Sequence, residues 1–214
     1  MRKLLRYPPT ICGEWEKGTW SIRPWIPGKS ICDAWERHRS RTTLPGIREI
    51  GSAALALDYL HESGWVHGNI RPDHLIIGKA PGEELKATLI GLSVAQGKHV
   101  SSDYEFPYPG YSIQCEAPEI AEAAISGGEI EPTEASDIYA LGASFLISAT
   151  GQRPVDYPED APHDRQREIT ATRDHQPVRI QGAFGQLIRA MIQRTPDERP
   201  TAADVAAEAA SWST

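Results

Sequence analysis

The 214-residue sequence predicts a single domain of the α+β class that is mainly helical. Three observations predict this class. Residues 134–149 form a helical segment that is apolar on nearly every side, which is typical of a buried helix. Shorter segments of helical periodicity follow one another along the chain, and two pairs of short β-forming runs interrupt them.

Two β-hairpins are expected in the first half of the chain. Residues 10–26 alternate β-forming and polar residues around Lys17-Gly18, a pattern typical of a hairpin. The runs 74–78 and 87–95 are separated by a polar turn and predict a second hairpin.

Helices are expected wherever apolar residues recur every three or four positions. Residues 96–115 show no periodicity and predict a long ordered loop. Thr201 and Asp204 resemble a capping box at the start of the last helix. Besides the buried helix, the predicted helices cover 30–39, 45–64, 163–173, 183–194 and a segment from Thr201.

Composition and charge exclude several classes of function. The formal charge of −7 argues against nucleic-acid binding, which depends on a basic surface. No apolar run approaches the ~20 residues that a membrane-spanning helix needs, and the first ten residues lack the apolar core of a signal peptide. Three scattered cysteines without metal-ligand spacing fit a reducing compartment, so we expect a cytoplasmic protein without a membrane partner. The chain begins with Met1 and a coherent hairpin follows, so we expect a natural start.

Five motifs in a fixed order and spacing carry a resemblance to the protein kinase family. They resemble, in turn, the catalytic loop, the D-F-G segment, the A-P-E motif, the start of the F helix and the closing P-x-x-R-P motif. In this chain they read Val66-His67-Gly68-Asn69-Ile70-Arg71-Pro72-Asp73-His74-Leu75-Ile76, Leu89-Ile90-Gly91-Leu92-Ser93-Val94-Ala95, Ala117-Pro118-Glu119, Ser136-Asp137-Ile138-Tyr139-Ala140-Leu141-Gly142 and Pro196-Asp197-Glu198-Arg199-Pro200-Thr201.

The resemblance covers roughly residues 20–210 and implies a fold and three structural roles. We expect one kinase-like domain over 1–214, with 1–26 as a truncated N-lobe remnant and 27–214 as the helical C-lobe. The resemblance also implies that Glu119 pairs with Arg199 and that Asp137 accepts hydrogen bonds from the catalytic-loop backbone. It implies a structural role for His67, as a hinge of the same loop.

The positions that carry phosphoryl transfer in the family have changed in this sequence. Kinases use an Asp base together with an Asn and an Asp that bind magnesium. The corresponding residues here are Asn69, His74 and Gly91, and Gly68 replaces the arginine that precedes the base. A glycine-rich phosphate loop and its associated lysine are also missing from the sequence. We therefore expect no metal, no cofactor and no binding of ATP and magnesium.

Two functional hypotheses follow from this pattern. The first is a catalytically inactive pseudokinase that binds a protein or peptide as a scaffold or allosteric partner. The alternative is a kinase-fold enzyme with other chemistry, as in peptide-modifying pathways of bacterial proteins with this fold, or one completed by a partner chain. Its candidate catalytic residues are His67, Asn69, Arg71, Asp73 and His74, and His67, Asp73 and His74 are also a candidate metal or acid-base cluster.

Two groups of aromatic residues are open to either of two interpretations. Trp15, Trp20, Trp25 and Trp35 either form an interface or cover the top of the predicted C-lobe. The second group forms a peptide-binding lip or an anchor for its loop, and consists of Tyr104, Phe106, Tyr108 and Tyr111.

Overall fold

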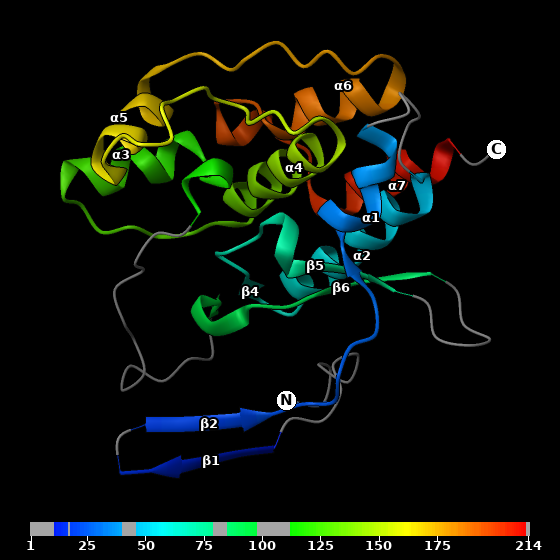
Figure 1. Ribbon diagram of the computed structural model, residues 1–214, viewed down its shortest axis with the longest axis vertical. Coiled ribbons are helices and arrows are strands. Elements are labelled where there is room, and N and C mark those ends of the chain that lie inside the picture. The colour runs from blue at the N-terminus through cyan, green and yellow to red at the C-terminus, as the bar shows by residue number, and fades with distance from the viewer. Residues whose placement is uncertain (1–10, 17, 40–45, 79–84, 98–111, 213–214) are drawn as a thin grey trace.

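The computed structural model describes residues 11–16, 18–39, 46–78, 85–97 and 112–212 (Figure 1). The fold is mainly helical with small sheets, which confirms the predicted fold class. Its α-helices are α1 (Ile31–Arg39), α2 (Ile47–Glu62), α3 (Pro118–Ser126), α4 (Glu134–Thr150), α5 (His163–Thr172), α6 (Gly182–Met191) and α7 (Ala202–Ser211). Single 3-10 turns occur at η1 (Pro72–His74), η2 (Leu92–Val94), η4 (Ile113–Cys115) and η5 (Pro196–Glu198).

The strands form three small antiparallel sheets among the described residues. Strands β1 (Ile11–Trp15) and β2 (Gly18–Ile22) form the first predicted hairpin, which lies apart from the helical body in Figure 1. Strands β3 (Lys29–Ser30), β5 (Leu75–Gly78) and β6 (Lys86–Leu89) lie in the order β3-β5-β6. Strands β4 (Trp65–Val66) and β7 (Gln96–Gly97) pair with each other.

The second hairpin is shorter than the sequence predicted. Strands β5 and β6 pair from Leu75 opposite Leu89, but the strand ends there and does not continue to residue 95. The reason is Gly91, whose φ of +79° lies in the left-handed region and turns the chain into η2. The apolar pattern beyond Leu89 therefore belongs to a turn that contains η2 and ends before strand β7.

Helix α4 is the central buried helix that its all-round apolar sequence predicted. Its N-terminus is closed by a capping box between Thr133 and Ser136. Helices α1 and α6 pack against it, and Trp35 of α1 stacks on Phe145 of α4 with ring centroids 5.6 Å apart. Trp35 is fully buried in this core, which separates it from the exposed Trp15, Trp20 and Trp25 of the same predicted group.

Helix α3 was not predicted as a helix. Pro118 in its first turn and Gly127 at its C-cap, with φ of +68°, are ordinary helix boundary signals. The nine residues of this helix are too few for a clear periodicity. Helix α3 packs against α5, and α2 packs against α7 (Figure 1).

Two further predictions concern the aromatic loop and the absence of a membrane-spanning helix. The aromatic residues Tyr104, Phe106, Tyr108 and Tyr111 lie outside the described residues, so both interpretations of that group stay predictions. Within the described ranges, none of the helices is both long and apolar enough to cross a bilayer.

Candidate functional site

The loop between β4 and β5 is held by one buried carboxylate, that of Asp137 on α4. Its Oδ2 accepts a hydrogen bond from the backbone N–H of His67 at 2.7 Å, and its Oδ1 accepts one from Gly68 at 2.9 Å. The His61 side chain on α2 donates to Oδ2 at 3.0 Å. A carboxylate buried with three donors is well satisfied, so Asp137 fixes this loop against both α2 and α4.

Both ring nitrogens of His67 form hydrogen bonds with backbone groups. Its Nε2 donates to the carbonyl oxygen of Ile90 at 3.0 Å, and its Nδ1 accepts from the N–H of Asn69 at 3.2 Å. Burial lowers the pKa of His67, although the charge of Asp137 acts in the opposite direction. The imidazole is therefore neutral and already bonded through both nitrogens, which suits a structural hinge better than a general base.

His74 fills the space beside Gly91. The His74 Nδ1 donates to the carbonyl oxygen of Asn69 at 2.7 Å, and Nε2 accepts from Nε of Arg71 at 3.1 Å. A Cβ atom at residue 91 would lie 2.5 Å from His74 Cε1 and 2.6 Å from Nδ1. Heavy atoms do not approach so closely, so the imidazole occupies the volume that any side chain at residue 91 would need.

Asn69 differs from its neighbours because its side-chain oxygen is unsatisfied. Asn69 is buried, and its Oδ1 has no hydrogen-bond partner among the described residues. With Asp137 and Glu116 it lines a cavity of about 20 Å³, which is large enough for a single water molecule. An amide in this position can bond to a water or to a neighbouring polar group, but it has no useful basicity.

The candidate cluster of His67, Asp73 and His74 does not form a metal site. Among the described residues, no group of three or more histidine, cysteine, aspartate or glutamate side chains is placed to hold a metal ion. Asp73 is exposed, and both imidazoles have their nitrogens engaged with other groups.

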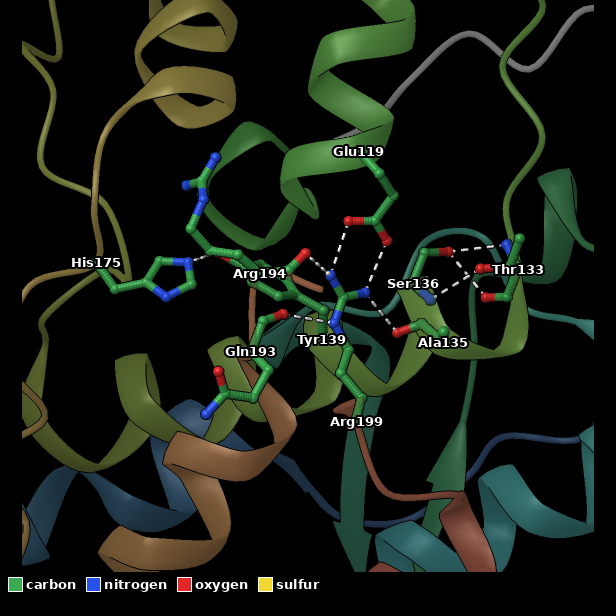
Figure 2. A network of polar contacts seen from close by, with 9 residues as sticks. All are labelled: Glu119, Thr133, Ala135, Ser136, Tyr139, His175, Gln193, Arg194 and Arg199. Carbon is green, nitrogen blue, oxygen red and sulfur yellow. Dashed lines mark hydrogen bonds and ion pairs between the residues drawn. The ribbon is translucent and has the colours of Figure 1, made fainter. Parts of the chain in front are cut away.

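A second polar network joins α3, α4 and η5 around Arg199 (Figure 2). The guanidinium donates to both carboxylate oxygens of Glu119 at 2.7 Å each. It also donates to three carbonyl oxygens, those of Ala135 at 2.9 Å, Gln193 at 2.7 Å and Arg194 at 3.1 Å. All five donors of a buried arginine are thus satisfied, and its charge also lies 5.0 Å from the ring centre of Tyr139.

Tyr139 connects this network to His175. The tyrosine hydroxyl lies 3.1 Å from Nε2 of His175 (Figure 2). Burial raises the pKa of Tyr139. The pKa of His175 is lowered from 6.5 to about 4, first by burial and then by the charges of Arg194 and Arg199. The histidine is therefore neutral near pH 7.

An open pocket of about 450 Å³ lies between η4, the connection 151–162 and α5. One of its lining residues, Arg167, donates to the buried carboxylate of Glu116 from Nε at 3.0 Å and from Nη2 at 3.3 Å. Burial raises the pKa of Glu116, although the hydrogen bond from Arg167 opposes this rise. The pocket is lined by Ser112, Ile113, Gln114, Arg153, Tyr157, Glu159, His163, Gln166 and Arg167.

Arg153 also lines this pocket, and its carboxylate partners are weaker than the partner of Arg167. Its guanidinium lies 4.1 Å from the ring centre of Tyr157 and donates to that residue's carbonyl oxygen at 3.0 Å. Its two carboxylate partners, Asp156 and Glu159, are 3.8 and 3.9 Å away and highly exposed. Sequence reasoning did not find the pocket, because its residues come from three separate segments without a motif.

Comparisons with known proteins agree on one family. The sequence profile described as protein kinase domain matches residues 25–210. The chain is similar to "Serine/threonine-protein kinase PknJ" of Mycobacterium tuberculosis, with 25% identity over 66% of this chain and 23% of that protein. It is also similar to human "STE20-related kinase adapter protein beta", with 33% identity over 48% of this chain and 24% of that protein. The chain spans about a quarter of the length of these relatives.

The fold comparison agrees with the sequence comparison. The chain resembles Rad53, in a crystal structure of residues 1–466 with AMP-PNP, at a TM-score of 0.62 and 17% identity. The match covers 90% of this chain and 47% of that one. The identity is low, so this likeness concerns the fold alone.

Proposed function

Since this chain belongs to the protein kinase family, we propose that it is a pseudokinase module that binds another polypeptide and does not transfer phosphate. Four features support this proposal: the ligand set at the kinase metal positions, the packing of His74 on Gly91, the pocket beside α5, and the retained network around Arg199.

The metal-nucleotide group of kinases does not fit the residues at these positions. Magnesium prefers hard oxygen ligands in octahedral geometry. Residue 91 has no side chain, and residue 74 offers imidazole nitrogens that are bonded to Asn69 and Arg71. Asn69 stands where the family has its aspartate base, and an amide cannot accept the proton of a substrate hydroxyl. We therefore derive no phosphoryl-transfer step for this chain.

The observation that carries the proposal is the contact between His74 and Gly91. If only the carboxylate at residue 91 had been lost, one substitution could restore it. Here the imidazole fills the space in which the carboxylate of a D-F-G segment would have to begin, with 2.5 Å between a Cβ at residue 91 and Cε1 of His74. The two replacements are complementary, so restoring either residue alone cannot rebuild the metal site.

We place the polypeptide-binding site at the pocket beside α5. Its volume of about 450 Å³ lies within the range of roughly 300–1,000 Å³ that is usual for ligand sites. Arg167 is engaged by a buried carboxylate, whereas the exposed partners of Arg153 can be replaced by an incoming carboxylate. The site therefore suits a peptide that carries an acidic side chain, with Tyr157 as an aromatic wall.

Relatives named as adapters agree with a binding role. The chain is 33% identical to human "STE20-related kinase adapter protein beta" and 30% identical to human "STE20-related kinase adapter protein alpha" over the matched parts. Other relatives are named as serine/threonine kinases, so membership of the family alone does not separate the two roles. The separation rests on the residues at positions 69, 74 and 91.

Peptide binding tests the proposal directly. The probes are two fluorescent peptide sets that are identical except that the central residues are Glu in one set and Lys in the other. We expect the Glu set to bind more tightly, and Arg153→Gln to weaken that binding roughly tenfold, the effect of one lost charge-assisted hydrogen bond.

The matched control is Arg165→Gln on α5. Arg165 is exposed, pairs with Glu168 and is not one of the residues that line the pocket, so this variant should bind the Glu set like the unchanged protein. Equal binding of both peptide sets, or an equal effect of the two variants, would count against the pocket as the site.

The alternative of a kinase-fold enzyme with other chemistry stays a prediction. Its candidate residues are His67, Asn69, Arg71, Asp73 and His74, and the geometry gives it little support because both imidazoles are bonded through their two nitrogens. Of these five residues, as far as the structure describes them, Asn69 alone has a buried side-chain polar atom without a hydrogen-bond partner.

A further inference from the structure

The hairpin β1–β2 has one apolar face that the described residues do not cover. Ile11 pairs with Ile22 and Gly13 with Trp20 across the strands, so side chains at 11, 13 and 15 share a face with those at 20 and 22. Cys12 and Glu14 belong to the opposite face by the same alternation. The exposed fractions of the large side chains are 64% for Ile11, 63% for Trp15, 44% for Trp20 and 61% for Ile22.

This face has a defined internal structure. A Cβ at Gly13 would lie 2.4 Å from Cζ2 of Trp20, so the indole lies flat across the glycine. The hairpin is therefore a two-stranded ribbon with a packed aromatic surface on one side. Such a ribbon is only marginally stable by itself in water, and burial of its apolar face would stabilise it.

The size of the surface is sufficient for a stable interface. Trp25 follows the hairpin and is 87% exposed. A fully buried aromatic side chain contributes roughly 150–250 Å². Scaled by the exposed fractions of Trp15, Trp20 and Trp25, this gives on the order of 300–500 Å² of apolar area. The two isoleucines add to this area. A standard interface buries about 800 Å² per partner, of which roughly 56–65% is apolar, so the hairpin face and Trp25 together supply this apolar share.

We propose that this surface pairs with the same surface of a second copy of the chain. A twofold interface covers both faces at once, because the same patch serves on each copy. The face formed by residues 11, 13, 15, 20 and 22 carries no charged side chain, so two copies meet there without repulsion between like charges. Two ribbons stacked face to face, about 10 Å apart, form a small sandwich in which the four aromatic and aliphatic positions interdigitate.

The charge of the chain adds a distinctive salt dependence. With a formal charge of −7 on each copy, the approach of two copies is opposed by long-range repulsion. Added salt screens this repulsion, with a Debye length of about 8 Å near physiological ionic strength. Dimerisation through this face should therefore become tighter as salt rises.

Sedimentation of the full chain over a concentration series tests the proposal. The unchanged protein should go from monomer to dimer, with a tighter dissociation constant at higher salt. The double variant Trp15→Ser/Ile22→Ser should dimerise at least about tenfold more weakly, since a buried tryptophan at an interface centre often carries much of the binding energy. This variant leaves the contact of Trp20 with Gly13 in place.

The matched control is Leu55→Ser on α2. Leu55 is 53% exposed and lies outside the hairpin, so the substitution removes a comparable apolar side chain elsewhere and should leave dimerisation unchanged. Hydrogen exchange of the amides at 11–22 gives a second measurement, and their protection should rise with protein concentration. A chain that stays monomeric throughout, a dimer that survives the double variant, or amides protected equally at all concentrations would each overturn the proposal.

Discussion

Two buried polar clusters in this molecule differ in how completely they are satisfied. Around Arg199, all five guanidinium donors have acceptors, and Glu119 receives two of them at 2.7 Å (Figure 2). In the loop that resembles the catalytic loop, Asn69 has an unsatisfied oxygen, and an imidazole occupies the space beside Gly91. The first cluster joins helices and the second contains the positions of kinase chemistry. The difference supports the proposal that this chain keeps the connections of the kinase C-lobe without its phosphoryl-transfer groups.

The largest effect is expected from breaking the Arg199 cluster. Arg199→Ala leaves the Glu119 carboxylate without its guanidinium partner and three carbonyl oxygens without a donor. Loss of one member of a buried ion pair typically costs about 3–5 kcal/mol. The Arg199 side chain is fully buried but Glu119 is 27% exposed, so we expect a decrease of about 3–4 kcal/mol in the free energy of unfolding. Urea denaturation monitored by circular dichroism measures it.

The exposed pair of Arg165 and Glu168 provides the control for this prediction. Both side chains are more than half exposed, so Arg165→Ala should cost less than about 1 kcal/mol. Similar losses for the two variants would show that the Arg199 cluster is not a main connection between the helices.

A smaller effect is expected at Gly91. Gly91→Ala places a Cβ 2.5 Å from the His74 ring and forces alanine to a φ of +79°, so we expect a loss of roughly 2–4 kcal/mol of stability. Gly151→Ala is the control for backbone strain alone, because Gly151 has a φ of +75° and an added Cβ there would meet nothing within 4 Å. This control should cost only about 1–2 kcal/mol.

The contact itself can be isolated with a double-mutant cycle. In a His74→Ala background, Gly91→Ala should cost no more than Gly151→Ala does, because the clashing ring has been removed. Thermal or urea unfolding of the four proteins gives the coupling free energy, which we expect to exceed about 1 kcal/mol in favour of the double variant. Additive costs would mean that the two residues do not depend on each other.

The smallest effect is a pH dependence at the edge of the Arg199 cluster. The pKa of His175 is about 4 in the folded chain against an ordinary 6.5, so the unfolded chain binds a proton that the folded chain does not bind between these values. Stability therefore falls as pH decreases from 6.5 toward 4, and this contribution is fully present above 6.5. Because His175 is only partly buried, we expect on the order of 1 kcal/mol after solvent screening.

His175→Gln separates this effect from other titrating groups. The variant should lose less stability between pH 7 and pH 4.5 than the unchanged chain in paired urea titrations. If both proteins lose the same amount, His175 is not protonated on unfolding in this range.

The sequence predicted much of the fold because the information was local. The buried helix α4, the capping box at Thr201 and the first hairpin depend on residues a few positions apart. The partners Glu119 and Arg199 lie 80 residues apart, and only the resemblance to a known family brought them together. Helix α3 was missed because its nine residues give too short a pattern.

The site could be predicted only as a set of replaced residues. The sequence indicated that Asn69, His74 and Gly91 stand at the family's functional positions, but the packing of the imidazole on the glycine depends on how the loop folds back. The pocket beside α5 combines Gln114, Arg153 and Arg167, and no spacing rule connects them. The burial of Trp35 likewise depends on contacts with Phe145 and Phe184 of α4 and α6.

The most direct test of the central claim is thermal unfolding with a non-hydrolysable ATP analogue, with and without Mg²⁺ or Mn²⁺. A ligand at about 100 times its dissociation constant stabilises a protein by roughly 2.7 kcal/mol, which a melting curve resolves. We predict no metal-dependent rise in melting temperature for the unchanged chain or for Gly91→Asp alone. A metal-dependent rise in the unchanged chain would contradict the proposal that its metal positions cannot hold the kinase nucleotide group.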